Sequence, residues 1–259
     1  MNCKIKHIHY CPVKSLSFQS VNSCRITKNL GMKNDRIFAF TRGIDSKKAD
    51  IFEKNPNERK LNNLLTLKNS PVLNKYNFVY NSKKLTLIHK EKELISISSD
   101  NPEERSLLSN KLIDLEDTLI KPIFLLKNQD FPFYDTSHSN NVFNSMSLIN
   151  LSSIKDFEEK INYKIHHARF RGNIYINNIQ PWSEFNLINK KVLINNCLFK
   201  VLNKIPRCSA TNLAPNADKA DINLPRKLRD TYNHSDMGIY LKPLTDGVIK
   251  IGNEIKISN

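Results

Sequence analysis

Glycine and tryptophan are scarce in this sequence, and long apolar runs are missing. Six glycines and one tryptophan occur in 259 residues. With so few glycines, the turns between short strands must rely on Asn and Asp, which also tolerate left-handed backbone. No run of about 18 apolar residues is present, so no spanning helix is expected. The first residues contain no apolar core, so they do not predict a secretory signal.

Cysteine is uncommon too, and its spacing fits no disulfide framework. The odd number and the lack of any CxxC pair are typical of a reducing compartment, so we expect a cytoplasmic protein. Paired Cys/His spacing of the zinc-finger type is also missing. The five cysteines are Cys3, Cys11, Cys24, Cys197 and Cys208.

Acidic residues are outnumbered, with 25 Asp and Glu against 40 Lys and Arg, a net charge of +15. Thirty of the basic residues are Lys and ten are Arg, and they are spread along the chain. No Arg-rich tail or RNA-binding aromatic motif accompanies them. Most of this charge is therefore predicted to be a solvated Lys-rich surface, and no nucleic-acid partner is expected.

Short apolar runs dominate the rest of the pattern, and 39% of residues are hydrophobic, enough for a sizeable core. Helices are expected after Asp100-Asn101-Pro102, over 151–161 behind a capping Asn150, and over 225–232. The pattern predicts a mainly β chain with some α, barrel-like rather than alternating βαβ. The expected strands are 5–10, 21–27, 37–40, 78–80, 85–88, 94–97, 119–126, 174–176, 191–201, 238–241, 248–251 and 254–257.

Cationic and hydroxyl side chains follow two of the early strands. The segment 10–16 reads YCPVKSL and contains Lys14 and Ser15, and a second loop ends in Asp35-Arg36. A phosphate dianion is bound by clustered cations and multiple donors, which this set could supply. The alternative is an exposed turn with Arg36 paired to Asp35 at the surface.

Two arginines flank one aromatic residue at 169–173, which reads RFRGN. Arg169 and Arg171 are expected to project to the same side, where their charges repel unless an anion lies between them. An anionic ligand would satisfy both groups. The alternative is a structural ion pair with Glu184.

Cys208 is the cysteine best placed for chemistry. Arg207 precedes it and would favour the thiolate, a soft ligand for a transition metal. The alternative is that Cys208 is a small buried hydrophobe, which suits Cys24 and Cys197 better.

In their order along the chain, these segments resemble the MOSC superfamily. The resemblance implies a MOSC N-terminal β-barrel-like domain over 1–114 and a MOSC domain over 115–259, similar to bacterial relatives of the mitochondrial amidoxime-reducing component. The segments that carry it are YCPVKSL (10–16), Gly31 with Asp35-Arg36, SLINLSS (147–153), RFRGN (169–173), Trp182 and Glu184, Arg207-Cys208 with Ala210-Thr211, GIY (238–240) and GVIKIG (247–252).

The resemblance implies a molybdenum–molybdopterin cofactor with Cys208 as the molybdenum ligand and the catalytic residue. Asn144 and Ser145 lie where the family contributes a small polar contact, whereas Pro206 stands where relatives often carry Ser. The residues that would hold the pterin and its phosphate are Lys14, Ser15, Arg36, Asn144, Ser145, Arg169, Arg171, Asn173 and Arg207.

The implied activity is reduction of N-hydroxylated or related N-oxygenated small molecules. The cysteine spacing supplies no 2Fe–2S cluster, so the electrons would come from a separate ferredoxin- or flavoprotein-like donor. An alternative is a non-redox MOSC module that binds or carries the cofactor or sulfur. A basic nucleic-acid-binding barrel is a weaker alternative, since it explains neither Cys208 nor the ordered motifs.

Overall fold

An eight-stranded mixed sheet forms the larger part of the computed structural model, which describes residues 3–134 and 145–258. Among its named pairings, only β10 and β11 run parallel. In sheet order the strands are β16 (Ile255–Ser258), β12 (Lys191–Ile194), β13 (Cys197–Pro206), β14 (Asp236–Pro243), β10 (Met146–Asn150), β11 (Ile174–Asn177), β1 (Lys4–Tyr10) and β2 (Gln19–Val21).

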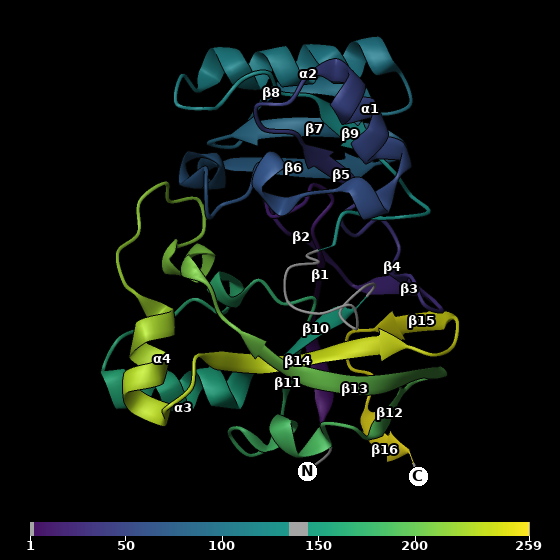
Figure 1. The fold of residues 1–259 in the computed structure, drawn as a ribbon. Coiled ribbons are helices and arrows are strands. Elements are labelled where there is room, and N and C mark those ends of the chain that lie inside the picture. Colours follow the sequence, from purple (N-terminus) through teal and green to yellow (C-terminus); the bar gives the residue numbers. More distant parts are fainter. Residues whose placement is uncertain (1–2, 135–144, 259) are drawn as a thin grey trace.

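A smaller β-rich part lies above this sheet in Figure 1, with two helices at its top. Its three-stranded meander turns through Ser82-Lys83 and Lys90-Glu91, all four with positive φ, as two-residue hairpin turns require. The elements here are β5 (Phe38–Phe40), α1 (Ser46–Lys54), β6 (Tyr76–Asn81), β7 (Lys84–His89), β8 (Lys92–Ser98), α2 (Pro102–Leu115) and β9 (Leu125–Lys127).

The N-terminal strands belong to the large sheet rather than to the smaller part. Strand β1 pairs with β11 on one side and β2 on the other, so early residues lie beside residues 174–177. A further small sheet joins β3 (Ser23–Thr27) to β4 (Gly31–Met32) and β15 (Gly247–Lys250). The division into 1–114 and 115–259 stays a prediction, and the site described below uses residues from both sides of it.

Two helices, α3 (Leu151–Ile161) and α4 (Leu224–Tyr232), pack at one end of the large sheet (Figure 1). Both helices were expected, and the Asn150 side chain caps α3 by accepting a hydrogen bond from Ser152 N at 3.0 Å. The short 3-10 helices are η1 (Pro56–Glu58), η2 (Leu61–Asn63), η3 (Pro71–Lys75), η4 (His167–Phe170), η5 (Ser183–Leu187) and η6 (Ser209–Asn212).

The expected mainly β architecture with some α is confirmed, with four α-helices in the described residues. No described helix has the length and apolarity needed to cross a membrane. The turns do rely on Asn, which accounts for eight of the sixteen non-glycine residues with positive φ among those described; Asp accounts for none of them.

Three strand predictions were wrong in their boundaries. Residues 191–201 form a hairpin, because Asn195 adopts left-handed backbone and reverses the chain. Residues 21–27 divide into β2 and β3, which pair in different sheets. In 119–126, only the end of the segment joins β9.

Strand β14 approaches β10 closely at Gly238, and a substitution at this position tests that packing. Its φ is +79°, and an added Cβ would lie 2.4 Å from Leu148 O and 2.9 Å from Ile149 Cγ1. We expect Gly238→Ala to lower the free energy of unfolding by about 3 kcal/mol, through strain and overpacking. Urea denaturation measures this.

The matched control is Gly252→Ala, where φ is +87° but nothing lies within 4 Å of the added Cβ. It carries only the backbone strain, about 1 kcal/mol. Equal losses in the two variants would contradict the close packing at Gly238.

Candidate functional site

The buried carboxylate of Asp35 joins three segments of the chain. It accepts hydrogen bonds from Cys11 N at 2.7 Å, from Asn173 Nδ2 at 3.4 Å and from Arg36 Nη1. Arg36 N in turn donates to Cys11 O at 2.6 Å. The loop after β1, the turn before β5 and the start of β11 are therefore held together around one negative charge.

Left-handed backbone is concentrated at these segments. Outside the Asn residues and the two hairpin turns, four described non-glycine residues have positive φ: Ser15, Arg36, Arg171 and Trp182. Such a conformation costs other residue types about 1–3 kcal/mol and is often found at functional sites. The first three are residues for which the resemblance implies cofactor contacts.

Two guanidinium groups approach the ring of Phe18. The Arg171 Cζ lies 4.9 Å and the Arg36 Cζ 5.8 Å from the ring centroid. Arg36 has Asp35 as its ion partner, whereas no carboxylate within 4.0 Å of Arg171 is found in the described part of the chain. Arg171 instead donates to Leu16 O at 2.6 Å. Two positive charges thus share one nearby carboxylate.

The pKa shifts of Arg171 and Arg36 reflect the presence of two positive charges beside one carboxylate. Burial lowers the pKa of Arg171, and nearby Arg36 lowers it further, while negative charge on Cys11 or Cys208 would oppose the shift. For Arg36, burial alone would lower the pKa, but the Asp35 carboxylate raises it above its ordinary value overall. An anion bound near Arg171 would relieve the repulsion between the two arginines.

Cys208 is the one exposed cysteine of the five. It precedes η6, and its carbonyl accepts hydrogen bonds from Thr211 N at 3.0 Å and Thr211 Oγ1 at 2.9 Å. The buried thiols differ, because burial raises the pKa of Cys11 and raises that of Cys24 to about 12. Cys208 is therefore the accessible thiol, and it lies near enough to Arg171 and Arg207 for electrostatic interaction with both.

Arg207 directs its guanidinium toward main-chain carbonyls. Its Nη1 donates to Phe170 O at 2.8 Å, and its Nε donates to Met237 O at 2.9 Å. A second donor, Nη2, also reaches Met237 O. These bonds connect the segment before Cys208 to η4 and β14.

Arg169 forms a structural ion pair, but with a partner other than the expected one. Its Nη1 and Nη2 lie 2.7 and 2.5 Å from the two carboxylate oxygens of Asp221, and Nη1 also donates to Asn212 O at 2.9 Å. Glu184 is buried elsewhere and accepts from Asn150 and Ser153. The suggested Arg–Glu184 pair was therefore wrong.

The remaining predicted site residues differ in how many of their polar side-chain atoms already form hydrogen bonds within the protein. Asn173 is buried, with Oδ1 accepting from Ser147 N and Oγ and Nδ2 donating to His9 O and Asp35. The Ser15 hydroxyl oxygen accepts from Leu67 N at 3.2 Å. Ser145 is buried just before β10. Asn144 lies outside the described residues.

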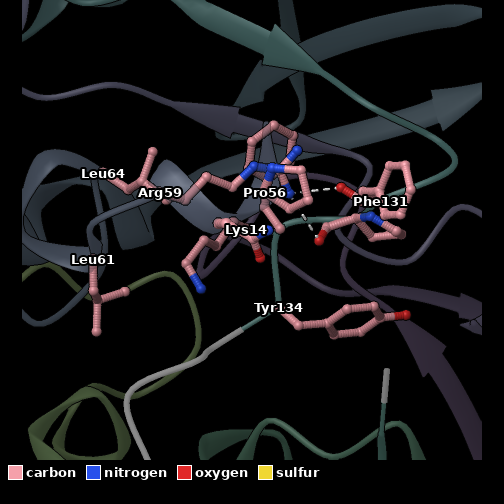
Figure 2. A pocket seen from close by; sticks show the side chains of 10 residues that line it. Lys14, Pro56, Arg59, Leu61, Leu64, Phe131 and Tyr134 are labelled. Atoms are coloured by element: carbon pink, nitrogen blue, oxygen red, sulfur yellow. Dashed lines mark hydrogen bonds between the residues drawn. The ribbon is translucent and has the colours of Figure 1, made fainter. Parts of the chain in front are cut away.

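A cavity of about 540 Å³ opens beside Lys14 (Figure 2). Its walls are mostly apolar and aromatic, and Lys14 points its Nζ into the space between Leu61 and Tyr134. The Tyr134 ring also lies 5.7 Å from the Arg36 Cζ, so this cavity and the paired arginines adjoin. Lysine in such surroundings suits an anion that carries a flat ring system.

A second, smaller cavity of about 180 Å³ is lined by Ser17 and Phe18 of the segment after Lys14. Phe18, Arg169, Arg171 and Ala210 are among its lining residues. The two arginines of RFRGN therefore do face one cavity, as expected, although Arg169 is already paired there.

Sequence reasoning missed three residues that shape the site. Phe18 follows the YCPVKSL segment and separates the two guanidinia, and Asp221 neutralises Arg169 across 52 residues of chain. Arg59 lines the larger cavity but donates to Phe52 O and Phe131 O, so it anchors the loop at Phe131. Only the position of Phe18 beside a basic motif offered a local signal.

The Arg169–Asp221 pair predicts a pH-dependent stability. Arg169 holds the pKa of Asp221 below its ordinary value of 3.8. Its stabilisation is complete above that pH and is lost as the pH falls through the lowered pKa. Because the Asp221 side chain is 44% exposed, we expect Asp221→Asn to cost about 1 kcal/mol at neutral pH.

Urea unfolding at neutral pH and at about pH 3 measures the effect, since protonation should shrink the difference between wild type and variant. Asp218→Asn, an exposed change in the same loop, should leave stability unchanged at both pH values. A variant difference that persists undiminished in acid would contradict the ion-pair origin.

The comparison with protein-family models agrees with the sequence resemblance. Residues 135–256 match the family model of the MOSC domain. No curated protein matches the chain. Among solved structures, YiiM from Geobacillus stearothermophilus is similar at 16% identity and a TM-score of 0.36, over 44% of this chain and 54% of that one. The YuaD protein from Bacillus subtilis is similar at 8% identity and a TM-score of 0.47, over 99% of this chain and 96% of that one.

The match thus spans about half of the YiiM chain, and neither structural likeness bears on activity. The family match covers β10 to β15 and includes Arg169, Arg171, Arg207 and Cys208. Residues 135–256 are thus the part of the chain that matches the MOSC domain family.

Proposed function

We propose that the chain binds a molybdenum–molybdopterin cofactor, with Cys208 as the molybdenum ligand. The observation that supports this most is the pair of guanidinia around Phe18, which share one carboxylate beside an exposed thiol. A soft thiolate ligand and uncompensated positive charge are what a metal-bearing pterin phosphate requires. The MOSC domain match is consistent with this cofactor.

The phosphate would lie at Lys14, Ser15 and Arg36. The Ser15 oxygen accepts from Leu67 N, which leaves its hydroxyl hydrogen available to donate. Arg36 reaches Asp35 through Nη1, so its planar group has further N–H donors for a second anion. Lys14 adds positive charge at the edge of the 540 Å³ cavity, where the pterin rings would be accommodated.

Some predicted residues already form hydrogen bonds within the protein, so fewer residues are proposed to contact the cofactor directly. Asn173 and Arg207 are assigned as positioning residues, because their polar atoms already bond Ser147, Asp35 and main-chain carbonyls. Arg169 is assigned the same role through Asp221. Ser145, with Asn144 outside the described residues, keeps its proposed small polar contact.

The substrate would react at the Cys208 end. When bound, the cofactor supplies two-electron oxygen-atom exchange with the substrate. Arg207 would hold the Cys208 segment in place through its hydrogen bonds to Phe170 O and Met237 O. The proposed substrates are N-hydroxylated small molecules. An acidic ferredoxin- or flavoprotein-like electron donor would complement the net charge of +15.

Cys208→Ser tests the metal ligand. We expect molybdenum per chain, measured by elemental mass spectrometry after expression in a cofactor-producing host, to fall at least tenfold. A hydroxyl is a harder and far less acidic ligand than a thiol. Cys3→Ser is the matched control, since Cys3 is a half-buried thiol that is not part of the proposed site, and it should retain molybdenum.

In the same preparations, Arg171→Gln should release most of the pterin, read as the fluorescence of the oxidised cofactor. Arg226→Gln, which removes an exposed arginine on α4, should not. Wild-type protein without molybdenum or pterin, or equal retention in Cys208→Ser, would contradict the proposal.

The proposed activity has a separate test. Molybdenum-loaded protein with a reduced artificial donor should convert an amidoxime to the amidine, using two electrons and two protons and releasing water. Product is quantified by chromatography, and Cys208→Ser should reduce the rate at least a hundredfold. Loaded protein that is inert on several N-oxygenated substrates would instead favour a non-redox module that carries the cofactor or sulfur.

A further inference from the structure

Three histidines that take no part in the proposed cofactor site converge on one face of the large sheet. One ring nitrogen from each of His7, His9 and His167 lies within 4.8 Å of the other two. We propose that these three imidazoles bind a divalent transition-metal ion, with Zn²⁺ as the first candidate. The proposal does not depend on the molybdenum cofactor.

The β-sheet explains how two of these residues come together. His7 and His9 alternate along β1 and therefore point to the same face, while Ile8 and Tyr10 enter the core on the other side. Strand pairing places Tyr175 of β11 opposite His7. The Tyr175 ring contacts all three imidazoles edge-on, at centroid distances of 4.8–6.2 Å.

The third ligand is supplied by η4, which begins at His167. Tyr175 Oη donates to His167 O at 3.1 Å and accepts from Gly172 N at 2.8 Å. This tyrosine fixes η4 over the strand pair. His167 is therefore held above β1 by tertiary bonds, independently of any metal.

The distances are close to those of a ligand set. Zn–N bonds of about 2.0–2.1 Å in a tetrahedron require nitrogens about 3.4 Å apart and ring centroids about 5 Å apart. The observed centroid separations are 4.8 Å for His7–His167 and 6.0 Å for the other two pairs. The His7 and His167 rings are stacked at an interplanar angle of 9°, so metal binding requires one of these rings to rotate as well as a shift of His9 toward them.

His9 also shows the unfilled valence expected of a metal ligand. Its Nδ1 lies 2.9 Å from Ser20 Oγ on β2, which leaves Nε2 as the nitrogen for a metal. That Nε2 is buried and has no hydrogen-bond partner, a costly condition that a bound ion would relieve. A second hydrogen bond that orients the ring is typical of ligating histidines.

The ligand chemistry selects the metal. Each of the three side chains offers an imidazole nitrogen, a ligand that suits late first-row divalent ions. The described group contains no carboxylate, which disfavours Mg²⁺ and Ca²⁺ and favours Zn²⁺, Ni²⁺ or Cu²⁺. Three histidines also leave a fourth tetrahedral position for water.

Cobalt titration of the full-length protein tests the site. Co²⁺ reports tetrahedral coordination by its visible absorption, and we expect one equivalent to bind and Zn²⁺ to displace it. His9→Gln and His167→Asn should each weaken Co²⁺ binding at least tenfold. Cys208→Ser should keep binding intact, which separates this site from the proposed molybdenum ligand.

His166→Asn is the matched control. The His166 Nδ1 accepts from Ala168 N at 3.2 Å as the cap of η4, and Asn preserves that role while removing the neighbouring imidazole. This variant should bind Co²⁺ like wild type. If His9→Gln fails to fold, judged by circular dichroism, the half-buried His7→Asn replaces it. No saturable binding by wild type, or undiminished binding by the ligand variants, would overturn the proposal.

Discussion

The buried carboxylate of Asp35 is the interaction on which the proposed site depends. It fixes Arg36 directly and reaches the chain around Cys11 and Asn173 through hydrogen bonds. Removing one partner of a buried ion pair typically costs about 3–5 kcal/mol, because the other charge remains uncompensated. One carboxylate nevertheless cannot neutralise two guanidinia, and Arg171 is the group left over. The hydrogen bonds of Asp35 that hold these segments together therefore leave one positive charge that a bound anion would neutralise.

The uncompensated charge of Arg171 lies beside the YCPVKSL segment only because β1 belongs to the large sheet. The loop after β1 brings Leu16 O to within 2.6 Å of Arg171, across 155 residues of sequence. If the early strands belonged only to the smaller part of the molecule, the YCPVKSL segment would lie away from η4. The site is thus a product of long-range strand pairing, and the family-matched region 135–256 contains only part of it.

Local signals in the sequence predicted much of this structure. Capping side chains predicted α2 and α3, α4 was expected over 225–232, and the ordered motifs gave most of the proposed site. Partners distant in sequence were beyond such signals. Asp221 rather than Glu184 pairs with Arg169, and β15 pairs with β3, more than 200 residues earlier in the chain. The polar helix α1 was missed because only Ala49 and Phe52 of its residues are buried.

The arginines differ in how many of their N–H groups and charges are already partnered within the protein, and this distinguishes structural arginines from candidates for ligand binding. Arg59 and Arg207 donate most of their N–H groups to main-chain carbonyls, which connects loops and leaves few donors for a ligand. Arg105 Nε is buried without a partner, but its charge is compensated by Glu53. Arg171 differs because it has no carboxylate within 4.0 Å among the described residues and also lies beside a second guanidinium, that of Arg36. The His9 Nε2 is the neutral counterpart, a buried lone pair or N–H without a partner. The uncompensated charge of Arg171 favours an anion, whereas the clustered imidazoles around His9 favour a cation. One basic chain can therefore hold ligands of opposite charge.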